Sequence, residues 1–245
     1  MQNADGDTPL HIVVRQQDHE CVELLLEEGA EARAIVNSEG EGPLHVAAGN
    51  SDPHSVQMLL DYGADPNAAN ETAGDTALHI AVRNQDYEST TKLLTAEPTP
   101  HRRRCHPSTA NGDGDTALHI AVGYGVLESV NELIEFGADT CTVNDAGASP
   151  LHTAAKKKYP EVVSGLIMAG ADANVPDGKG NTALHTVVAN RDATNAKKML
   201  KKGEQRHCSP RQPSTRHAIM SLKYAWQAQI LSWRIKLVTH RCWLP

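Results

Sequence analysis

Six histidines recur at nearly regular intervals and are the first residues to test for chemistry. They are His11, His45, His79, His119, His152 and His185. The spacings are 34, 34, 40, 33 and 33 residues, and the stretch GDTALHIAV occurs at 74–82 and again, letter for letter, at 114–122. Imidazole can bind a metal or transfer a proton, but a catalytic motif usually occurs once. A near-constant period of this length indicates a structural repeat, and histidines one repeat apart are too distant to share a metal ion.

A second cluster lies between the third and fourth histidine motifs. His101, Cys105 and His106 stand beside three consecutive arginines at 102–104. These side chains could bind zinc, but a fourth ligand is not near them in the sequence. The arginines could instead dock an acidic partner or a phosphate. A solvated loop is the third reading, and no metal is expected here.

The stretch NGDGDT at 111–116 resembles the start of a calcium loop. Such a loop needs glycine at its sixth place and glutamate at its twelfth, where this chain has Thr116 and Val122. No Ser/His/Asp or Cys/His arrangement suited to nucleophilic catalysis is evident outside the repeated positions. The sequence therefore predicts no catalytic residue, no cofactor and no small-molecule substrate, so the protein is not expected to be an enzyme.

Residues 111–140 show what one repeat contains. A Gly/Asp cluster forms a turn, Thr116 stands at an N-cap position, and an apolar run follows at once. Residues 118–122 are expected to form a short helix with small residues on one face. Gly123 and Gly125 are expected to end it.

A second helix follows in the same repeat. Apolar residues at 126, 130, 133 and 134 have helical spacing, and Gly137 suits the left-handed position after the helix. Neither helix can bury its apolar stripe alone. The neighbouring repeat must cover it, which is the principle of a solenoid.

The motif G-x-T-A/P-L-H, followed by a pair of large apolar residues and then by G-A-D, resembles the ankyrin repeat. Six copies cover residues 4–203, near 3–36, 37–69, 70–98, 111–142, 143–175 and 176–203. The resemblance implies an all-α solenoid over residues 1–205, made of stacked helix-turn-helix units with protruding turns. It also implies that each repeated histidine bridges backbone groups of adjacent turns.

Two departures from the family pattern bear on the structure. The Gly-His pair often found after the first helix is absent or half-present in every repeat, as in Gln85-Asp86, so a looser turn is expected there. The third repeat has no G-A-D, and a loop insert at 95–113 takes its place. Its second helix should stop near Thr95, because Pro98 and Pro100 cannot continue a helix.

The charge divides the chain at about residue 205. Residues 1–205 carry 30 acidic and 16 basic side chains, a balance of −14, and residues 206–245 carry 7 basic and no acidic ones. The acidic solenoid is not expected to bind nucleic acid. The tail, which holds all three tryptophans, has three readings: a degenerate capping repeat, a basic amphipathic helix that meets a membrane or an acidic partner, or a segment not shaped for this fold.

The five cysteines are odd in number and scattered along the chain. Free thiols in a reducing compartment are expected, in the cytoplasm or also in the nucleus. No apolar run reaches the roughly 18 residues of a membrane span. Contact with a membrane is therefore expected only through the tail.

By the layout of the family, the concave face of the solenoid binds protein partners. The residues expected on this face are Arg15, Gln16, Asn50, Arg83, Asn84, Tyr124, Lys156, Lys157 and Asn190. Arg83, Tyr124 and Lys156 are expected to follow one stripe and to contribute to binding but little to stability. The expected function is a non-catalytic protein-binding scaffold or adaptor.

Two alternatives stay open. The chain could be the recognition subunit of an enzyme or channel complex whose catalysis lies on another chain. Six repeats with an enlarged third-to-fourth junction also resemble the cytoplasmic inhibitors of Rel-type transcription factors, although the acidic tail typical of those inhibitors is not seen here.

Overall fold

The computed structural model describes residues 2–32, 35–96 and 104–203. The chain divides into two units, residues 1–203 and residues 204–245. The described residues form helices and loops, with three isolated β-bridges in the loops. Their helices are α1 (Pro9–Gln16), α2 (His19–Glu27), α3 (Pro43–Gly49), α4 (Pro53–Asp61), α5 (Ala77–Arg83), α6 (Tyr87–Thr95), α7 (Ala117–Tyr124), α8 (Leu127–Glu135), α9 (Pro150–Lys157), α10 (Pro160–Ala169), α11 (Ala183–Ala189) and α12 (Ala193–Gly203).

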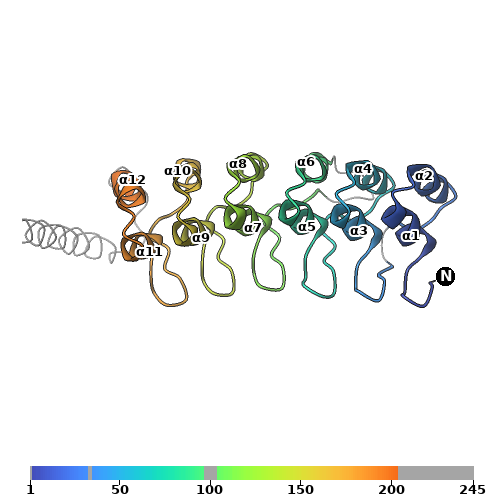
Figure 1. Ribbon diagram of the computed structural model, residues 1–245, viewed down its shortest axis with the longest axis horizontal. Helices are drawn as coiled ribbons and strands as arrows, with labels where there is room; N and C mark the ends of the chain where they lie inside the picture. The colour runs from blue at the N-terminus through green and yellow to red at the C-terminus, as the bar shows by residue number, and fades with distance from the viewer. Residues whose placement is uncertain (1, 33–34, 97–103, 204–245) are drawn as a thin grey trace, which may run out of the picture. The chain divides into compact units, whose positions relative to one another are not determined.

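These helices form six pairs in a row (Figure 1). The odd-numbered helices make one layer and the even-numbered helices the other, and a hairpin loop projects beside each odd-numbered helix. Each odd-numbered helix contacts the next one, and each even-numbered helix does the same. The predicted all-α solenoid of helix-turn-helix units is confirmed. None of the helices in the described part of the chain is long and apolar enough to cross a membrane.

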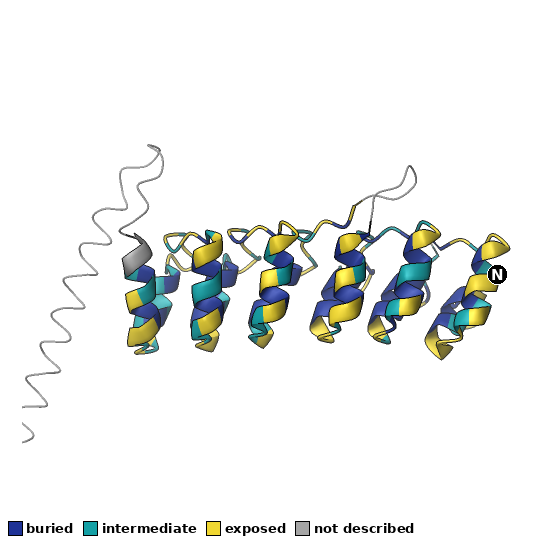
Figure 2. Cartoon of the chain, turned by 90° about the horizontal axis from the view of Figure 1, so that it is seen from above, coloured by how far each residue is buried: buried dark blue, intermediate teal, exposed yellow. Residues whose placement is uncertain are grey.

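The core lies between successive pairs, and the buried faces of the helices point toward it (Figure 2). The leucine before each repeated histidine is its most regular member. It is 0–4% exposed in the first five repeats, as Leu10, Leu44, Leu78, Leu118 and Leu151. Leu184 of the sixth repeat is only partly buried. Each of the five buried leucines is followed by a further described repeat.

Helix α7 shows how the local sequence sets the helix boundaries. Thr116 is its N-cap, as predicted, with an extended backbone. The helix continues through Gly123 and ends at Gly125, which takes the left-handed conformation with φ 76°. The expectation that Gly123 also breaks the helix is wrong, because its backbone stays helical. The predicted left-handed Gly137 and the predicted end of α6 at Thr95 are both confirmed.

The turn between the paired helices is tight in every repeat, contrary to the expectation from the missing Gly-His pair. In five repeats a residue other than glycine takes the left-handed conformation, with φ between 54° and 62°. These residues are Gln17, Ser51, Gln85, Lys158 and Arg191. Backbone hydrogen bonds hold the turn, as when Gln85 donates to Val82 and Asp86 donates to Ala81. These hydrogen bonds impose the left-handed conformation although a side chain makes it unfavourable.

Changing Gln85 to glycine is expected to raise the free energy of unfolding by about 0.5–1 kcal/mol. The change removes a left-handed strain of about 1–2 kcal/mol, which the greater flexibility of glycine in the unfolded chain partly offsets. Urea unfolding measures the effect. Gly125→Gln is the reverse change and should destabilise the protein, since a Cβ atom there would also lie 2.8 Å from the Tyr159 ring. A destabilised Gln85→Gly variant would show that the turn carries no strain.

Candidate partner-binding face

The repeated histidines are part of the scaffold. In each repeat the Nδ1 atom accepts a hydrogen bond of 3.1–3.2 Å from the backbone N–H of the helix N-cap residue. In the first five repeats Nε2 then donates to a backbone carbonyl oxygen of a hairpin loop, such as Glu41 for His11 and Asp115 for His79, over 2.9–3.1 Å. The bridging role is confirmed for these five histidines, and both ring nitrogens are in use.

Burial lowers the pKa of four of these histidines, His11, His45, His79 and His119. The hydrogen bonds fix the tautomer as well. Because Nδ1 accepts from a backbone N–H, the single ring proton must be on Nε2. The neutral imidazole is therefore the form that fits this position.

Asparagine side chains in the hairpin loops also connect successive repeats. Asn111 accepts from the N–H groups of Asp113 and Asp115 through Oδ1 and donates to the Asp75 carboxylate over 2.8 Å. Asn37 and Asn144 make the equivalent bonds to Asp7 and Asp115. The polar groups of NGDGDT are thus used to shape and join the hairpins.

Both predicted partner-binding arginines form ion pairs within the scaffold. Arg15 forms an ion pair with Asp7, and Arg83 forms one with Asp75 over 2.6 Å. Burial alone would raise the pKa of Asp75, but the hydrogen bonds from Arg83 and Asn111 outweigh it and hold that pKa below its usual value. Asp75 is 2% exposed. Loss of Arg83 would leave a buried carboxylate without its counter-ion, so Arg83 contributes to stability, contrary to the expectation from the sequence.

The three predicted asparagines also contact the scaffold. Each Nδ2 donates to a backbone carbonyl near the end of the preceding odd-numbered helix: Asn50 to Val14 over 3.1 Å, Asn84 to Gly49 over 3.1 Å, and Asn190 to Ala155 over 3.1 Å. These bonds supply a donor, or a second donor, to carbonyls near the helix ends; the carbonyls of Val14 and Ala155 also accept from Gln17 and Lys158. We call this the inter-repeat asparagine bond.

The remaining predicted residues on this face are exposed. Gln16, Tyr124 and Lys157 stand at the repeat position that asparagine occupies elsewhere, and Lys156 stands at the position of Arg15 and Arg83. No hydrogen bond or ion pair joins their side chains to any other residue in the described ranges. Tyr124 is 47% exposed. An alignment of the six repeats shows an aspartate eight residues before Arg15 and Arg83 and none before Lys156, but it does not show which side chains bond to a neighbouring repeat.

The insert returns to the scaffold at Cys105. The amide of Asn67 donates to the carbonyl of Arg104 and accepts from the N–H of His106, both over 2.8 Å. Cys105 is buried where other repeats place the alanine of G-A-D, and burial raises the pKa of its thiol to about 12. A thiol that stays protonated is a poor zinc ligand.

Several predictions for the insert and the tail lie outside the described residues. They concern His101, the arginines at 102 and 103, and the three readings of residues 206–245. In the described ranges no three His, Cys, Asp or Glu side chains are placed to hold a metal ion, and Cys21, Cys105 and Cys141 are free thiols.

Comparison with known proteins places the chain in a family. A family profile described as ankyrin repeats in three copies matches residues 1–70 and 78–177. The protein belongs to the ankyrin-repeat family. No curated protein sequence matched the chain.

Solved structures of ankyrin repeat domains resemble this chain closely. The ankyrin repeat domain of Bcl-3, described as a unique member of the IkappaB protein family, is 33% identical, with a TM-score of 0.74 over 81% of this chain and 87% of its own. An ankyrin repeat domain from Acinetobacter baumannii AYE is 26% identical, with a TM-score of 0.72 over 80% of this chain and 97% of its own. The ankyrin repeat protein EF0377 is 26% identical, with a TM-score of 0.70 over 81% and 98%.

Proposed function

We propose that this protein is a non-catalytic scaffold or adaptor that binds protein partners through the face formed by the ends of its odd-numbered helices and the hairpin tips. The observation that carries the proposal is the division of residues on that face. The asparagines of this face bond to the preceding repeat, whereas Gln16, Tyr124 and Lys157 at the same position, and Lys156 beside it, are exposed. Ankyrin repeat domains are in general protein–protein interaction modules.

The proposal includes a reducing compartment, the cytoplasm or the nucleus, because free thiols persist there. It includes no small-molecule substrate and no catalytic residue. The chain is proposed to act as a binding partner, either alone or as the recognition subunit of a larger enzyme or channel complex.

The resemblance to Bcl-3 favours one particular form of this function, an inhibitor-type partner of a transcription factor. The 33% identity over 81% of the chain supports it. Co-purification of a transcription factor with the full chain, and its loss on mutation of the exposed face, would distinguish this form from a general adaptor.

Changing Tyr124 to asparagine tests the proposed face. Tyrosine can bury a rigid ring with a polar tip. If Tyr124 is a hot spot, its loss should weaken the binding of a native partner by at least about 2 kcal/mol. An asparagine at this position is expected to donate to the carbonyl of Val82 or Arg83, as Asn84 does one repeat earlier. Stability should therefore be kept or slightly raised. Calorimetric affinity and urea unfolding are measured on the same preparations.

Tyr87→Asn is the matched control, because Tyr87 is 44% exposed but begins α6 in the other layer. It should leave the affinity unchanged. Normal binding by Tyr124→Asn, together with loss of binding when residues 206–245 are deleted, would assign recognition to the tail and contradict the proposal.

A further inference from the structure

The charge of the solenoid changes sign along its length. Residues 1–142 carry 24 acidic and 7 basic side chains, whereas residues 143–203, which include the last two repeats, carry 5 acidic and 9 basic ones. The overall acidic balance hides this change. The last two repeats are thus a basic region next to four strongly acidic ones.

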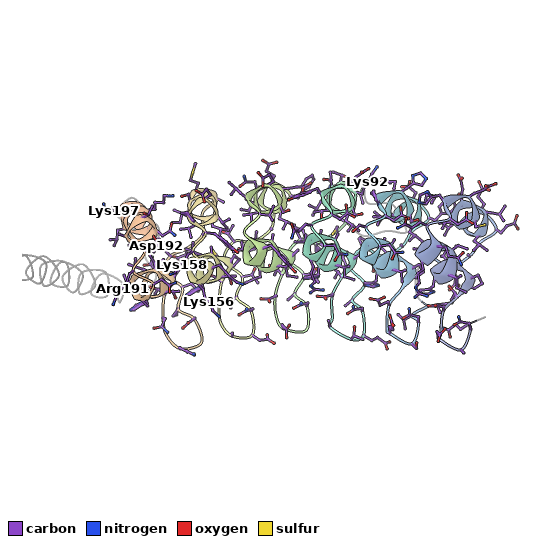
Figure 3. All side chains as sticks on the ribbon, in the orientation of Figure 1. Lys92, Lys156, Lys158, Arg191, Asp192 and Lys197 are labelled. Carbon is purple, nitrogen blue, oxygen red and sulfur yellow. The ribbon has the colours of Figure 1, made fainter. Side chains whose placement is uncertain are left out.

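Five of these cations lie together where the paired helices turn. They are Lys156, Lys157, Lys158, Arg191 and Lys197, which we call the basic edge, and all five are exposed. They come from the end of α9, the turns after α9 and α11, and α12, and α11 contacts both α9 and α12. Figure 3 shows Lys156, Lys158, Arg191 and Lys197 gathered at this end of the solenoid around Asp192, with Lys92 well apart from them.

The repeat pattern explains why the basic edge lacks counter-ions. Lys156 stands at the position of Arg15 and Arg83, each of which pairs with an aspartate eight residues earlier. For Lys156 that residue is Ala148. Asn181 takes the same place in the sixth repeat, so the last two repeats have lost the carboxylate that the first four carry there.

The acidic groups close to the basic edge do not replace the missing carboxylate as an ion-pair partner. Asp192 accepts from the N–H groups of Thr194 and Asn195 with one oxygen and from the Asn195 side chain, over 2.6 Å, with the other. Within the described ranges, Arg15–Asp7 and Arg83–Asp75 are the ion pairs that arginine or lysine makes, and none joins Glu161 to the basic edge. Asp192 keeps its negative charge, but it is one carboxylate beside five exposed cations, so the basic edge keeps a net positive charge for a ligand.

We propose that the basic edge docks an acidic, Asp/Glu-rich peptide segment of a protein partner. This proposal rests on the proposed function, because it names the chemistry of that partner. Opposite charge would draw such a segment to this end of the solenoid and fix its direction along the repeats. A long nucleic acid fits less well, since it would extend over the acidic repeats within a few Debye lengths.

A labelled deca-glutamate peptide is the probe, and its affinity for the full chain is measured by fluorescence anisotropy at about 0.1 M salt. The test variant is Lys158→Gly with Arg191→Gly. Both residues have positive φ, so glycine removes two charges and relieves strain instead of harming the fold. The affinity should fall about tenfold, since each lost contact is worth a few-fold at a solvated surface. Stability should rise at the same time, a combination that a purely structural role would not produce.

Two controls separate charge from backbone effects. Gln17→Gly with Gln85→Gly makes the same backbone change without loss of charge and should leave the probe affinity unchanged. Lys92→Glu makes the same change of two units in net charge, two repeats away, and should lower the affinity less than about twofold, because screening weakens charges beyond about 10 Å.

Several results would overturn the proposal. An equal loss with Lys92→Glu would mean that only net charge matters, and unchanged affinity of the test variant would place binding elsewhere, including on the basic tail. Tighter binding of a single-stranded oligonucleotide of equal charge at the same residues would make the edge a nucleic-acid site. Self-association by light scattering that the test variant abolishes would make a second copy the occupant. These results are independent of the affinity measured for Tyr124→Asn. A failure of the basic-edge proposal can therefore be distinguished from a failure of the proposed function.

Discussion

Leu118→Ala is expected to lower the free energy of unfolding by about 2–5 kcal/mol, the usual cost of removing a large side chain from a packed core. Leu118 is 0% exposed in α7, and α7 packs between α5 and α9. Because helices pack on both sides of this site, the cavity left by the missing atoms cannot collapse easily. In a solenoid, the interfaces with both neighbouring repeats lose contacts at once.

The exposed Leu24→Ala is the matched control. Leu24 undergoes the same chemical change on α2 but is 59% exposed, so the effect should stay within about 0.5 kcal/mol. Urea unfolding followed by far-ultraviolet circular dichroism gives both values. Similar midpoints for the two variants would mean that the contact between the third and fourth repeats is not part of the cooperative core.

Stability is expected to fall when the pH drops below about 6.5, the ordinary pKa of histidine. Burial lowers the pKa of His11, His45, His79 and His119 in the folded protein. Above the unfolded pKa these histidines are neutral in both states, and their contribution is complete. Below it the unfolded chain binds protons that the folded chain does not, so unfolding becomes easier. Each histidine can contribute up to about 1.4 kcal/mol per pH unit.

Other groups act in a different pH range. The pKa values of Asp7, Asp52 and Asp75 are below their ordinary 3.8, so their contribution is lost only in stronger acid. Burial raises the pKa of Glu41 above its ordinary 4.5, which works in the opposite direction but concerns one group. Histidine should therefore dominate between about pH 6.5 and pH 4.5.

Urea unfolding at a series of pH values measures this slope. His79→Gln should reduce it by about one proton, because the neutral amide cannot take up a proton. Gln16→Asn, an exposed change that removes no titratable group, should leave the slope as it is. A free energy of unfolding that stays constant from about pH 7.5 to pH 5 would contradict the role of the buried histidines.

The sequence by itself determined the repeat unit and its fold. The period of the histidine motif, the Thr116 cap, the apolar spacing of α8 and the end of α6 at Thr95 could all be predicted. Caps, helical spacing and proline act within a few residues of the chain, so one sequence contains the information they need. Six copies made the pattern unambiguous.

Only the tertiary structure decided which variable residues remain exposed for a partner. Asn84 corresponds to Tyr124 in the repeat pattern, but its amide is used by a carbonyl 35 residues earlier. Arg83 is held by a carboxylate buried between repeats, whereas Lys156, at the same position, has Ala148 in place of that carboxylate. The left-handed Gln85 follows from the hydrogen bonds that close its turn. The asparagine bond and the burial of the carboxylate depend on how successive repeats superpose in space, and the spacing of residues along one repeat does not contain that information.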